Sequence, residues 1–492
     1  MPAASRDTER PSATFERDGG GRDELIEVLR GRIVELEVRL VERDAVIAEL
    51  RAVLGQSSRN SSKPPSSDGY SKPPVNKKRS LRRRSGRKPG GQPGSPGHHL
   101  ERREVSDEEV VHPLTRCEGC GGDLSQAPIV ESQSRQVLDL PDLRLRCVQH
   151  WIQRRRCACC GELCASSFPA EARAPVCYGP RIRALGIYLV SYEHLPYERA
   201  AGLLSDWVGA EVSVGSLQAF VAEGAEGLEE FLEEIRGQLT AADVAHFDET
   251  GGRIEGRLGW IHSASTETLT LLTAHSKRGV EAMDDAGVLP GFRGTAVHDG
   301  WAPYRSFKDA LHALCGAHHL RELVGAEEHG QVWALGMSCL LLDTKDAVDE
   351  AKAAGRDRLT AKALSELHAS YREVIKLGHE ENPGLTDQRG GRRPKRTKAQ
   401  NLLLRLDERE QETLRFAHDF RVPFDNNLCE RDLRMVKLQQ KISGCWRTTQ
   451  GAERFLAIRS YISTARKQGQ RPVDALTLLS SGRPWLPAPA PG

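Results

Sequence analysis

Apolar residues near the N-terminus recur in alternating steps of three and four residues. The positions are Ile26, Leu29, Ile33, Leu36, Leu40, Ile47, Leu50 and Leu54, with Arg43 at the one seam position that is not apolar. This spacing predicts a coiled coil of about four heptads. Because a single helix cannot bury such a seam, we expect a homodimer, or packing of this helix against the rest of the chain.

Two later stretches have helical patterns. In residues 178–240, a first apolar pattern is followed by Gly209 and by Ser213, which has the position of an N-cap. A helix, a turn containing glycine and a Ser-capped helix resemble a helix-turn-helix, although ordinary helix packing explains the pattern equally well. Residues 318–420 are also expected to be helical, with apolar runs at 332–335 and 340–342.

Residues 244–250 and 294–301 have the pattern of short strands that end in acidic residues. Strand alternation places Asp248 on one face with His246 and directs Glu249 to the other face. Both acids therefore cannot serve one site unless the strand is broken. Residues 259–263 and 269–273 are expected to be its partners in an antiparallel meander.

A helix is predicted to start near Asn427. One face carries an acid among bases, namely Glu430, Arg434, Lys437 and Lys441. The opposite face is mostly apolar, with Leu428, Met435, Val436 and Ile442. A purely structural explanation exists, because Asn427 as N-cap and Glu430 three residues later have the spacing of a capping box.

The length of 492 residues allows roughly two to four domains, and we expect an α+β multidomain fold. The net charge is only +2, but residues 72–88 hold a run of bases without an acid. They are Lys72, Lys77, Lys78, Arg79, Arg82, Arg83, Arg84, Arg87 and Lys88. Flanked by Ser-, Pro- and Gly-rich sequence that cannot form a core, this run predicts a flexible DNA-binding arm, or alternatively a solvated linker.

The sequence begins with a polar stretch, and it contains no apolar run that approaches the length of a membrane span. We therefore expect an intracellular protein. In a reducing compartment, the twelve cysteines are expected to be metal ligands or core residues.

Two Cys-x-x-Cys-Gly knuckles predict a structural zinc site with four thiolate ligands, Cys117, Cys120, Cys157 and Cys160. Two residues between thiolates allow one tight turn to direct both sulfurs to a tetrahedral ion. The ligand set stays open, because Cys147, Cys159, Cys164 and His112 are nearby. Such a closed site is expected to fold a small β-rich module around residues 137–156.

Acids at the ends of two strands, with a third on a helix, are what a two-metal site requires. Asp248, Asp299 and Glu430 together favour a phosphoryl-transfer site with two divalent cations. Arg434 and Lys437 are then candidates for holding the nucleic-acid backbone.

These motifs together resemble the transposases of the insertion-sequence-66 family, over about residues 26–478. The resemblance rests on the heptads, residues 58–65, the two knuckles, residues 298–301, Cys315-x-x-His318 with residues 320–323, residues 430–437, residues 443–447 and residues 460–467. It implies a ribonuclease-H-like DDE core with Asp248, Asp299 and Glu430 as its triad. It also implies DNA cleavage and strand transfer with magnesium or manganese, on double-stranded element ends and target DNA.

The resemblance and the residue patterns together give an expected domain order. It is a disordered N-terminus (1–24), a coiled coil (25–55), a disordered basic arm (56–105), a zinc module (106–177), a helix-turn-helix-like domain (178–240), the first part of the core (241–317), a helical insertion over the active site (318–420), the final part of the core with the catalytic helix (421–480) and a tail (481–492). We expect a cytoplasmic, nucleoid-associated bacterial protein that accessory proteins of the same element can assist.

Three alternatives remain at this point. Cys315, His318 and His319 could form a second metal site, although packing or DNA contact is favoured because no second cysteine pair completes the set. The whole chain could instead be a non-catalytic DNA-binding regulator. It could also be a ribonuclease-H-like nuclease that cuts without joining.

Overall fold

The computed structural model describes residues 27, 31–35, 37, 43, 60, 100–383 and 396–488. Most of the expected coiled coil lies outside these residues, but those described between 27 and 43 are all helical. Ile33 and Val34 are more than half exposed within the single chain. The basic run at residues 72–88 lies outside the described residues.

A five-stranded mixed sheet forms the centre of the molecule, in the order β5-β4-β3-β6-β7. The strands are β3 (Val244–Ile254), β4 (Arg257–Ser265), β5 (Thr270–His275), β6 (Thr295–His298) and β7 (Leu311–Leu314). The first three are antiparallel, as the sequence predicts, whereas β6 pairs in parallel with both β3 and β7. A two-residue turn joins β3 to β4, with positive φ at Glu255 and Gly256, which suits the twist of a hairpin.

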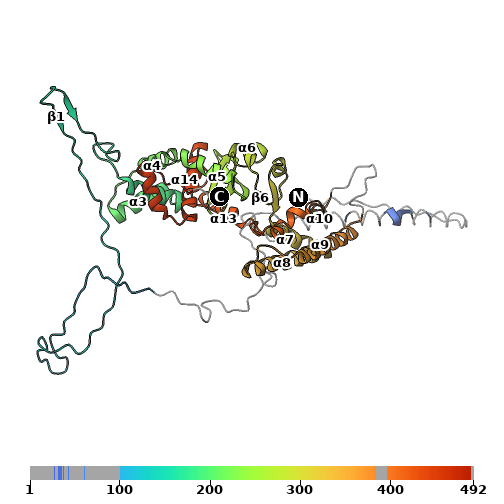
Figure 1. Ribbon diagram of the computed structural model, residues 1–492, viewed down its shortest axis with the longest axis horizontal. Coiled ribbons are helices and arrows are strands. Elements are labelled where there is room, and N and C mark those ends of the chain that lie inside the picture. Colours follow the sequence, from blue (N-terminus) through green and yellow to red (C-terminus); the bar gives the residue numbers. More distant parts are fainter. Residues whose placement is uncertain are drawn as a thin grey trace, which may run out of the picture.

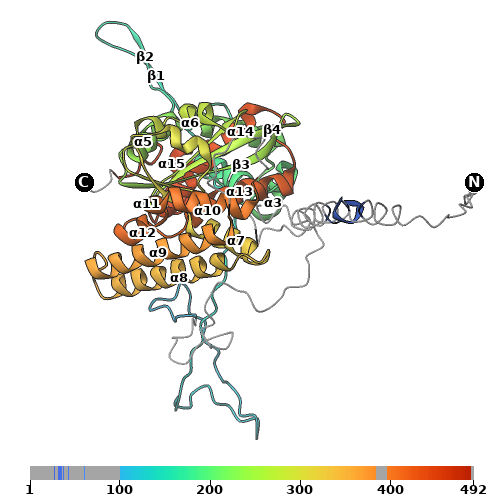
Figure 2. The same cartoon turned by 90° about the vertical axis from the view of Figure 1, so that its right-hand side faces the viewer.

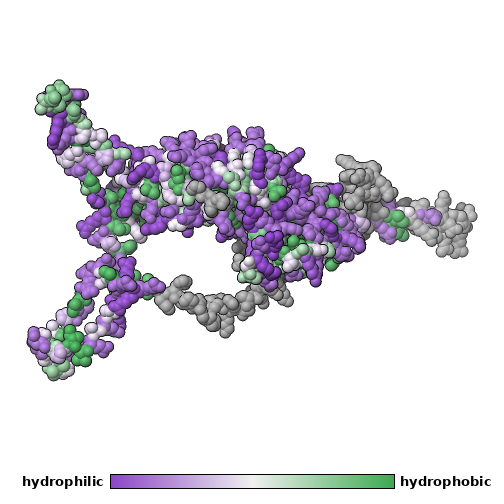
Figure 3. All heavy atoms as spheres, viewed as in Figure 1, coloured by the Kyte–Doolittle hydropathy of each residue, from purple (hydrophilic) through white to green (hydrophobic). Residues whose placement is uncertain are grey.

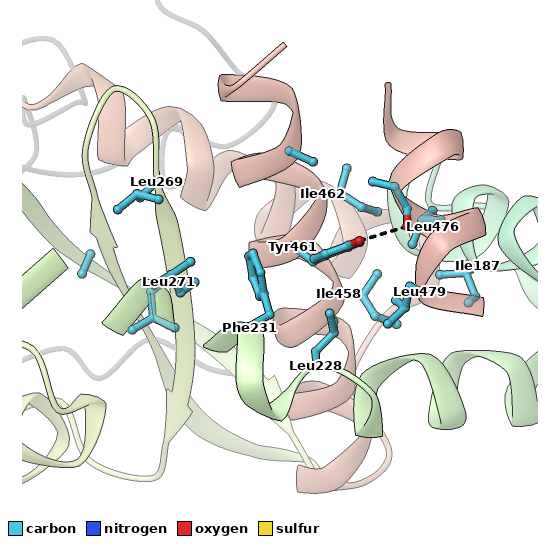
Figure 4. Packing of buried hydrophobic residues seen from close by; sticks show 14 of the residues in the cluster. Ile187, Leu228, Phe231, Leu269, Leu271, Ile458, Tyr461, Ile462, Leu476 and Leu479 are labelled. Carbon is cyan, nitrogen blue, oxygen red and sulfur yellow. Dashed lines mark hydrogen bonds between the residues drawn. The ribbon is translucent and has the colours of Figure 1, made fainter. Parts of the chain in front are cut away.

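The first core cluster joins the sheet to helices that come before, between and after its strands in the sequence (Figures 1 and 4). They are α2 (Pro180–Ile187), η2 (Tyr188–Tyr192), α3 (Tyr197–Val208), α4 (Val214–Glu226), α5 (Glu229–Thr240), α6 (Val280–Ala286), α14 (Thr449–Lys467) and α15 (Pro472–Ser480). Ser213 caps α4 by accepting a hydrogen bond from Ser216 N, and Gly209 ends α3 at φ 64°, as the sequence predicts.

A second core cluster builds a helical layer below the sheet (Figure 2). It contains α7 (Gly316–Glu327), α8 (Val332–Ala353), α9 (Ala361–Glu381), α10 (Lys398–Glu408), α11 (Glu410–Thr413) and α12 (Arg415–His418). The prediction of helices between the last strand and residue 420 is therefore confirmed. α7 and α10 lie between the long pair α8–α9 and the sheet (Figure 2).

Helix α13 (Asn427–Ser443) packs against β3 and β4. Two details of its prediction are wrong. Its N-cap is Asn426, and no side chain caps it, because the Asn426 side chain bonds to β3 instead. Its buried residues are Cys429, Leu433 and Val436, whereas Ile442 is 45% exposed, because the sheet contacts a different stripe of the helix from the one expected.

Residues 100–177 extend away from this body (Figures 1 and 3). Their only named strands are β1 (Arg154–Arg156) and β2 (Leu163–Ala165), which form one hairpin. The β-rich module expected around residues 137–156 is thus reduced, in the described residues, to this hairpin and an isolated bridge between Arg116 and Asp123. Several apolar side chains here are exposed, including Val111, Val130 and Trp151.

The described helices include none that is both long and apolar enough to cross a membrane.

Tyr461 joins three segments of the first core cluster. Its ring meets Phe231 edge to face, with centroids 4.9 Å apart. Its hydroxyl donates to the Ala475 carbonyl and accepts from Trp485 N, both at 2.9 Å. Burial raises the pKa of Tyr461 to about 12, so the hydroxyl stays protonated and keeps donating.

We predict that Tyr461→Phe lowers the free energy of unfolding by about 1–3 kcal/mol, because it leaves the two buried backbone groups without this partner. Urea unfolding followed by circular dichroism measures the change. Tyr197→Phe is the control, since the Tyr197 hydroxyl makes no hydrogen bond to another described residue, and it should change stability by less than about 0.5 kcal/mol. An equal loss in both variants would contradict the assignment.

Candidate active site

Asp248 and Asp299 are brought side by side by the parallel pairing of β3 and β6. His246 is paired with Val297, so continuing the register by two residues places Asp248 beside Asp299. Asp299 lies just beyond the end of β6, where its Oδ1 accepts a hydrogen bond from Trp301 N at 2.8 Å. Asp299 follows the end of β6, but Asp248 lies in the middle of β3, because the pairing with β4 continues to Ile254. The prediction that the first strand ends at its acids is therefore wrong, although the register still brings the two acids side by side.

The charge environment of Asp248 shows that the acids interact. Burial raises the pKa of Asp248 well above its usual range, and the negative charges of Glu249 and Asp299 raise it further. Glu430 contributes in the same direction. All three predicted acids therefore lie close enough to interact electrostatically, although they come from β3, the loop after β6 and the first turn of α13.

Asn426 fixes the start of α13 against the sheet. Its side-chain Nδ2 donates to the Phe247 carbonyl and its Oδ1 accepts from His246 Nδ1, both at 2.8 Å. Its own backbone N donates to Cys315 Sγ at 3.2 Å, and its carbonyl accepts from Glu430 N. Asn426 is fully buried. These bonds set the position of Glu430 relative to Asp248.

Two side chains of α7 lie beside Glu430. His318 Nδ1 is 3.8 Å and an Arg321 guanidinium nitrogen is 3.6 Å from Glu430 Oε1. Burial, and then the charge of Arg321, lowers the pKa of His318 to about 3, so the imidazole is neutral. Arg321 is therefore the positive charge at this carboxylate.

The alternative of a second metal site at Cys315, His318 and His319 is not supported. The described residues contain no group of three or more His, Cys, Asp or Glu that could hold a metal ion. Cys315 is buried, and its sulfur accepts the Asn426 hydrogen bond. Burial raises its thiol pKa to about 12, which disfavours the thiolate that a metal needs.

Glu249 points away from Asp248, as strand alternation predicts, but it is a major part of the site's support. Its side chain is 1% exposed and accepts from Arg278 Nε at 2.9 Å, from a second Arg278 nitrogen at 2.6 Å and from the Tyr304 hydroxyl at 2.7 Å. The Arg278 guanidinium also stacks on Trp301, 3.9 Å from the ring centroid, and on Trp260 at 4.8 Å.

Arg278 thereby connects the part of β3 that carries Asp248 to the loop after β6 that carries Asp299. Glu249 follows Asp248 directly, and Trp301 donates its backbone N–H to Asp299. Sequence reasoning missed Arg278 and Tyr304, because a single arginine after a strand and a tyrosine in a 3-10 turn follow no pattern. The one sequence signal was Glu249 itself, because an acid in a strand needs a cation if its side chain is buried.

The predicted phosphate-binding cations have different surroundings. Arg434 is exposed on α13. Lys437 is half-buried, and its Nζ donates to the Gly251 carbonyl of β3. Burial lowers the pKa of Lys437. Of the other candidates, Lys77, Lys78, Arg79, Arg82, Arg83, Arg84, Arg87 and Lys88 lie outside the described residues.

The acidic residues suit a divalent cation in their chemistry. Burial raises the pKa of Asp248, and the negative charges of Glu249, Asp299 and Glu430 raise it further, so a cation bound here would relieve the repulsion. Carboxylate oxygens are the ligands that magnesium and manganese prefer. In the described residues the side chains are not gathered around one point, so ion binding requires them to move closer.

Each cysteine knuckle has the local geometry of a metal-binding turn. Cys117 N donates to the Gly122 carbonyl and Gly121 N to the Cys117 carbonyl, with Gly121 at φ 74°. The second knuckle repeats this, with Cys157, Glu162 and Gly161 at φ 75°. The left-handed φ explains the glycine that follows each pair.

Backbone amides in each knuckle point at the first sulfur. Those of Cys120 and Gly119 lower the pKa of the Cys117 thiol, and those of Cys160 and Cys159 lower that of Cys157. Both turns therefore favour thiolate, the form that binds zinc. The structure does not bring the two knuckles to one point within the described residues. Cys147, Cys159 and Cys164 are exposed, as are Cys120 and Cys160, so geometry does not choose among the ligand sets.

Comparison with known families gives three matches. Residues 175–454 match the family described as transposase IS66 family. Residues 115–161 match the zinc-finger binding domain of transposase IS66, and residues 19–101 match a family of unknown function. None of the curated proteins matches the chain.

The Glu249–Arg278 pair yields a test of the site's support. Arg278→Ala should lower the free energy of unfolding by about 2 kcal/mol, because it leaves a buried carboxylate unpaired. This is less than for a fully buried pair, since Arg278 is 35% exposed. Urea unfolding at pH 7 measures it.

Lys277→Ala is the matched control for this variant. Lys277 precedes Arg278 and forms an ion pair with Glu281 in which both side chains are at least 60% exposed. Its loss should change the free energy of unfolding by under about 0.5 kcal/mol. If Arg278→Ala changes the free energy of unfolding as little as Lys277→Ala does, the Glu249–Arg278 pair does not stabilise this part of the sheet.

Proposed function

Because the chain belongs to the IS66 family of transposases, we propose that it binds the ends of an insertion element and catalyses metal-dependent DNA strand cleavage and strand transfer. The observation that carries this proposal is that Asp299 and Glu430, from two other segments, lie near enough for their charges to act on Asp248. A buried carboxyl whose pKa is strongly raised by burial and by neighbouring charges is typical of a functional site.

The arrangement of the sheet supports a ribonuclease-H-like core. Three antiparallel strands are followed by two parallel ones, with β3 at the centre, Asp248 within β3 and Asp299 just after β6. Helix α13 follows the helical layer α7–α12 and brings Glu430 near these two acids. We propose that residues 241–317 and 421–480 form this core and that residues 318–420 are an insertion into it.

In the proposed mechanism, Asp248, Asp299 and Glu430 would hold two divalent cations, magnesium or manganese. When bound, such ions would supply activation of the attacking oxygen and charge stabilisation of the leaving oxygen of a phosphodiester. The chain's own residues position these ligands. Asn426 holds the start of the helix that carries Glu430 against β3. Arg278 holds the segments that carry Asp248 and Asp299 together, through its contacts with Glu249 and Trp301.

The DNA backbone also needs cations outside the metal site. Arg321 lies beside Glu430 and Arg434 is exposed one turn further along α13, so both can contact phosphates close to the acids. Lys437 can contribute once its bond to the Gly251 carbonyl is released. We propose that the basic run, Lys77 to Lys88, supplies binding to DNA that does not depend on sequence, and that the heptads form a homodimer.

The zinc-binding residues belong to a separate part of the proposal. Cys117, Cys120, Cys157 and Cys160 would hold one structural zinc ion that joins the two knuckles, with the glycines freeing backbone amides to face the sulfurs. The module would then bind DNA together with the basic arm.

The proposed triad is tested by Asp248→Asn, Asp299→Asn and Glu430→Gln. Each variant should lose DNA strand cleavage by about 10³-fold or more, because a bound metal ion contributes several kcal/mol to the barrier. The measurement uses labelled element ends with magnesium or manganese, and it resolves nicked, hydrolysed and joined products.

Asp309→Asn is the control for the triad variants. Asp309 is 69% exposed and pairs with Arg293 away from the acids, so its loss should leave cleavage unchanged. DNA binding without cleavage, in the wild type and in Glu430→Gln alike, would favour the non-catalytic regulator, whereas cleavage that persists in Glu430→Gln would remove this residue from the triad. Products that are only hydrolysed, never joined to target DNA, would favour a nuclease.

The zinc proposal predicts about one zinc ion per chain, measured by atomic emission on the purified protein. Cys117→Ser should lose the metal, because three thiolates hold zinc less tightly than four. Cys339→Ser, at an exposed position of α8, should keep it. Comparing Cys160→Ser with Cys159→Ser identifies the fourth ligand, and retention of zinc in every knuckle variant would rule out the site.

A further inference from the structure

Asn60 contacts α7, far away in the sequence. Its side-chain Nδ2 donates to Glu328 Oε2 at 2.7 Å, at the C-terminal end of the helix. Its backbone lies against Gly325, such that a methyl group on Gly325 would come within 2.3 Å of the Asn60 carbonyl oxygen. Asn60 is half-buried.

Gly325 gives this contact a signature in the sequence. It lies inside α7, where glycine is a poor helix former and a side chain would normally stabilise the helix. The atom that a side chain would meet is a backbone oxygen, which cannot rotate away as a side chain can. A glycine here is therefore explained by the close approach of the Asn60 backbone.

The contact lies on the same stripe of α7 as the residues beside Glu430. His318, Arg321, Gly325 and Glu328 follow one another at steps of three, four and three, which places them on one face of a helix. His318 and Arg321 lie within 4 Å of Glu430, and Gly325 and Glu328 contact Asn60.

We propose that the C-terminal end of α7, formed by Gly325 and Glu328, is an intramolecular docking site for Asn60, which anchors the N-terminal arm of the chain beside the candidate active site. Asn60 supplies both a backbone and a side-chain contact to this site. The docking contact does not depend on the proposed catalytic function.

The anchor limits where the neighbouring parts of the chain can reach. Lys77, the start of the densest bases, follows Asn60 by 17 residues, so it stays within about 60 Å of α7 at full extension. The last heptad position, Leu54, precedes Asn60 by six residues. DNA held by the basic run is thereby kept at a raised local concentration near the acids, and the heptads are kept near the same helix.

Limited proteolysis of the full-length protein tests the docking, without any need for activity. Trypsin cleaves after Arg59, so the bond it hydrolyses is the one that leads into Asn60. Gly325→Ala should displace Asn60 and accelerate this cleavage at least fivefold, measured by mass spectrometry of the N-terminal fragment. Glu328→Ala, which removes one hydrogen bond, should accelerate it about threefold.

Gly202→Ala is the matched control. Gly202 also lies inside a helix, α3, but a methyl group there has no atom within 4 Å, so cleavage after Arg59 should not change. Thermal melting of each variant separates undocking from unfolding. If Gly325→Ala does not fold, the exposed Glu328 decides the question, because its substitution leaves the core untouched.

Cleavage rates equal to wild type in Gly325→Ala and Glu328→Ala would overturn the proposal. Acceleration of the same size in Gly202→Ala would also overturn it. Accelerated proteolysis in Gly325→Ala and Glu328→Ala, with DNA strand cleavage unchanged in the triad variants, would support the docking and overturn the proposed function, so the two proposals fail separately.

Discussion

The buried hydrogen bonds of Asn426 are the constraint on which the candidate site depends. One side chain bonds to His246 and to the Phe247 carbonyl of β3, while its backbone bonds to Cys315 and to Glu430 N. Three segments far apart in the sequence meet at this residue. Since an unpaired buried polar group is costly, each bond discourages any movement that would break it. The distance between the helix acid and the strand acids is thus set by a polar junction and not by hydrophobic packing alone.

Around this junction, charge is arranged in two layers. Burial raises the pKa of Asp248, and the charges of Glu249, Asp299 and Glu430 raise it further. Glu249, on the other face of β3, is neutralised by Arg278 and hydrogen-bonded to Tyr304. Glu249, paired with Arg278, holds the backbone of β3 in place, while Asp248, Asp299 and Glu430 stay available for cations. Arg321 is the nearest positive charge to Glu430 among the described residues, and it lies on α7, the same helix that receives Asn60.

The segment that the sequence assigns to zinc lies outside the helices and strands of the two core clusters. Residues 100–177 extend from the body and expose apolar side chains such as Val130 and Trp151. Two knuckles prepared for thiolates, each with a left-handed glycine, lie in this region. A metal ion that joins them would supply the cohesion that a segment with so little regular structure lacks. The contact of Asn60 with Gly325 and Glu328 would likewise attach the N-terminal arm to helix α7 through a few polar atoms.

The sequence by itself determined the features that depend on local spacing. The knuckle turns, the antiparallel strands β3, β4 and β5, the Ser213 cap and the helical layer after β7 all follow from periodicity or from residues near in the chain. It also identified Asp248, Asp299 and Glu430 as a group, through motifs similar to a known family. Only the tertiary structure decided that Asn426 bonds to β3 instead of capping α13, that Cys429, Leu433 and Val436 face the sheet, and that Lys437 bonds to Gly251. It alone paired Glu249 with Arg278 and Gly325 with Asn60. The reason is that such contacts depend on strand register and on packing between distant segments, which leave no periodic trace in the sequence.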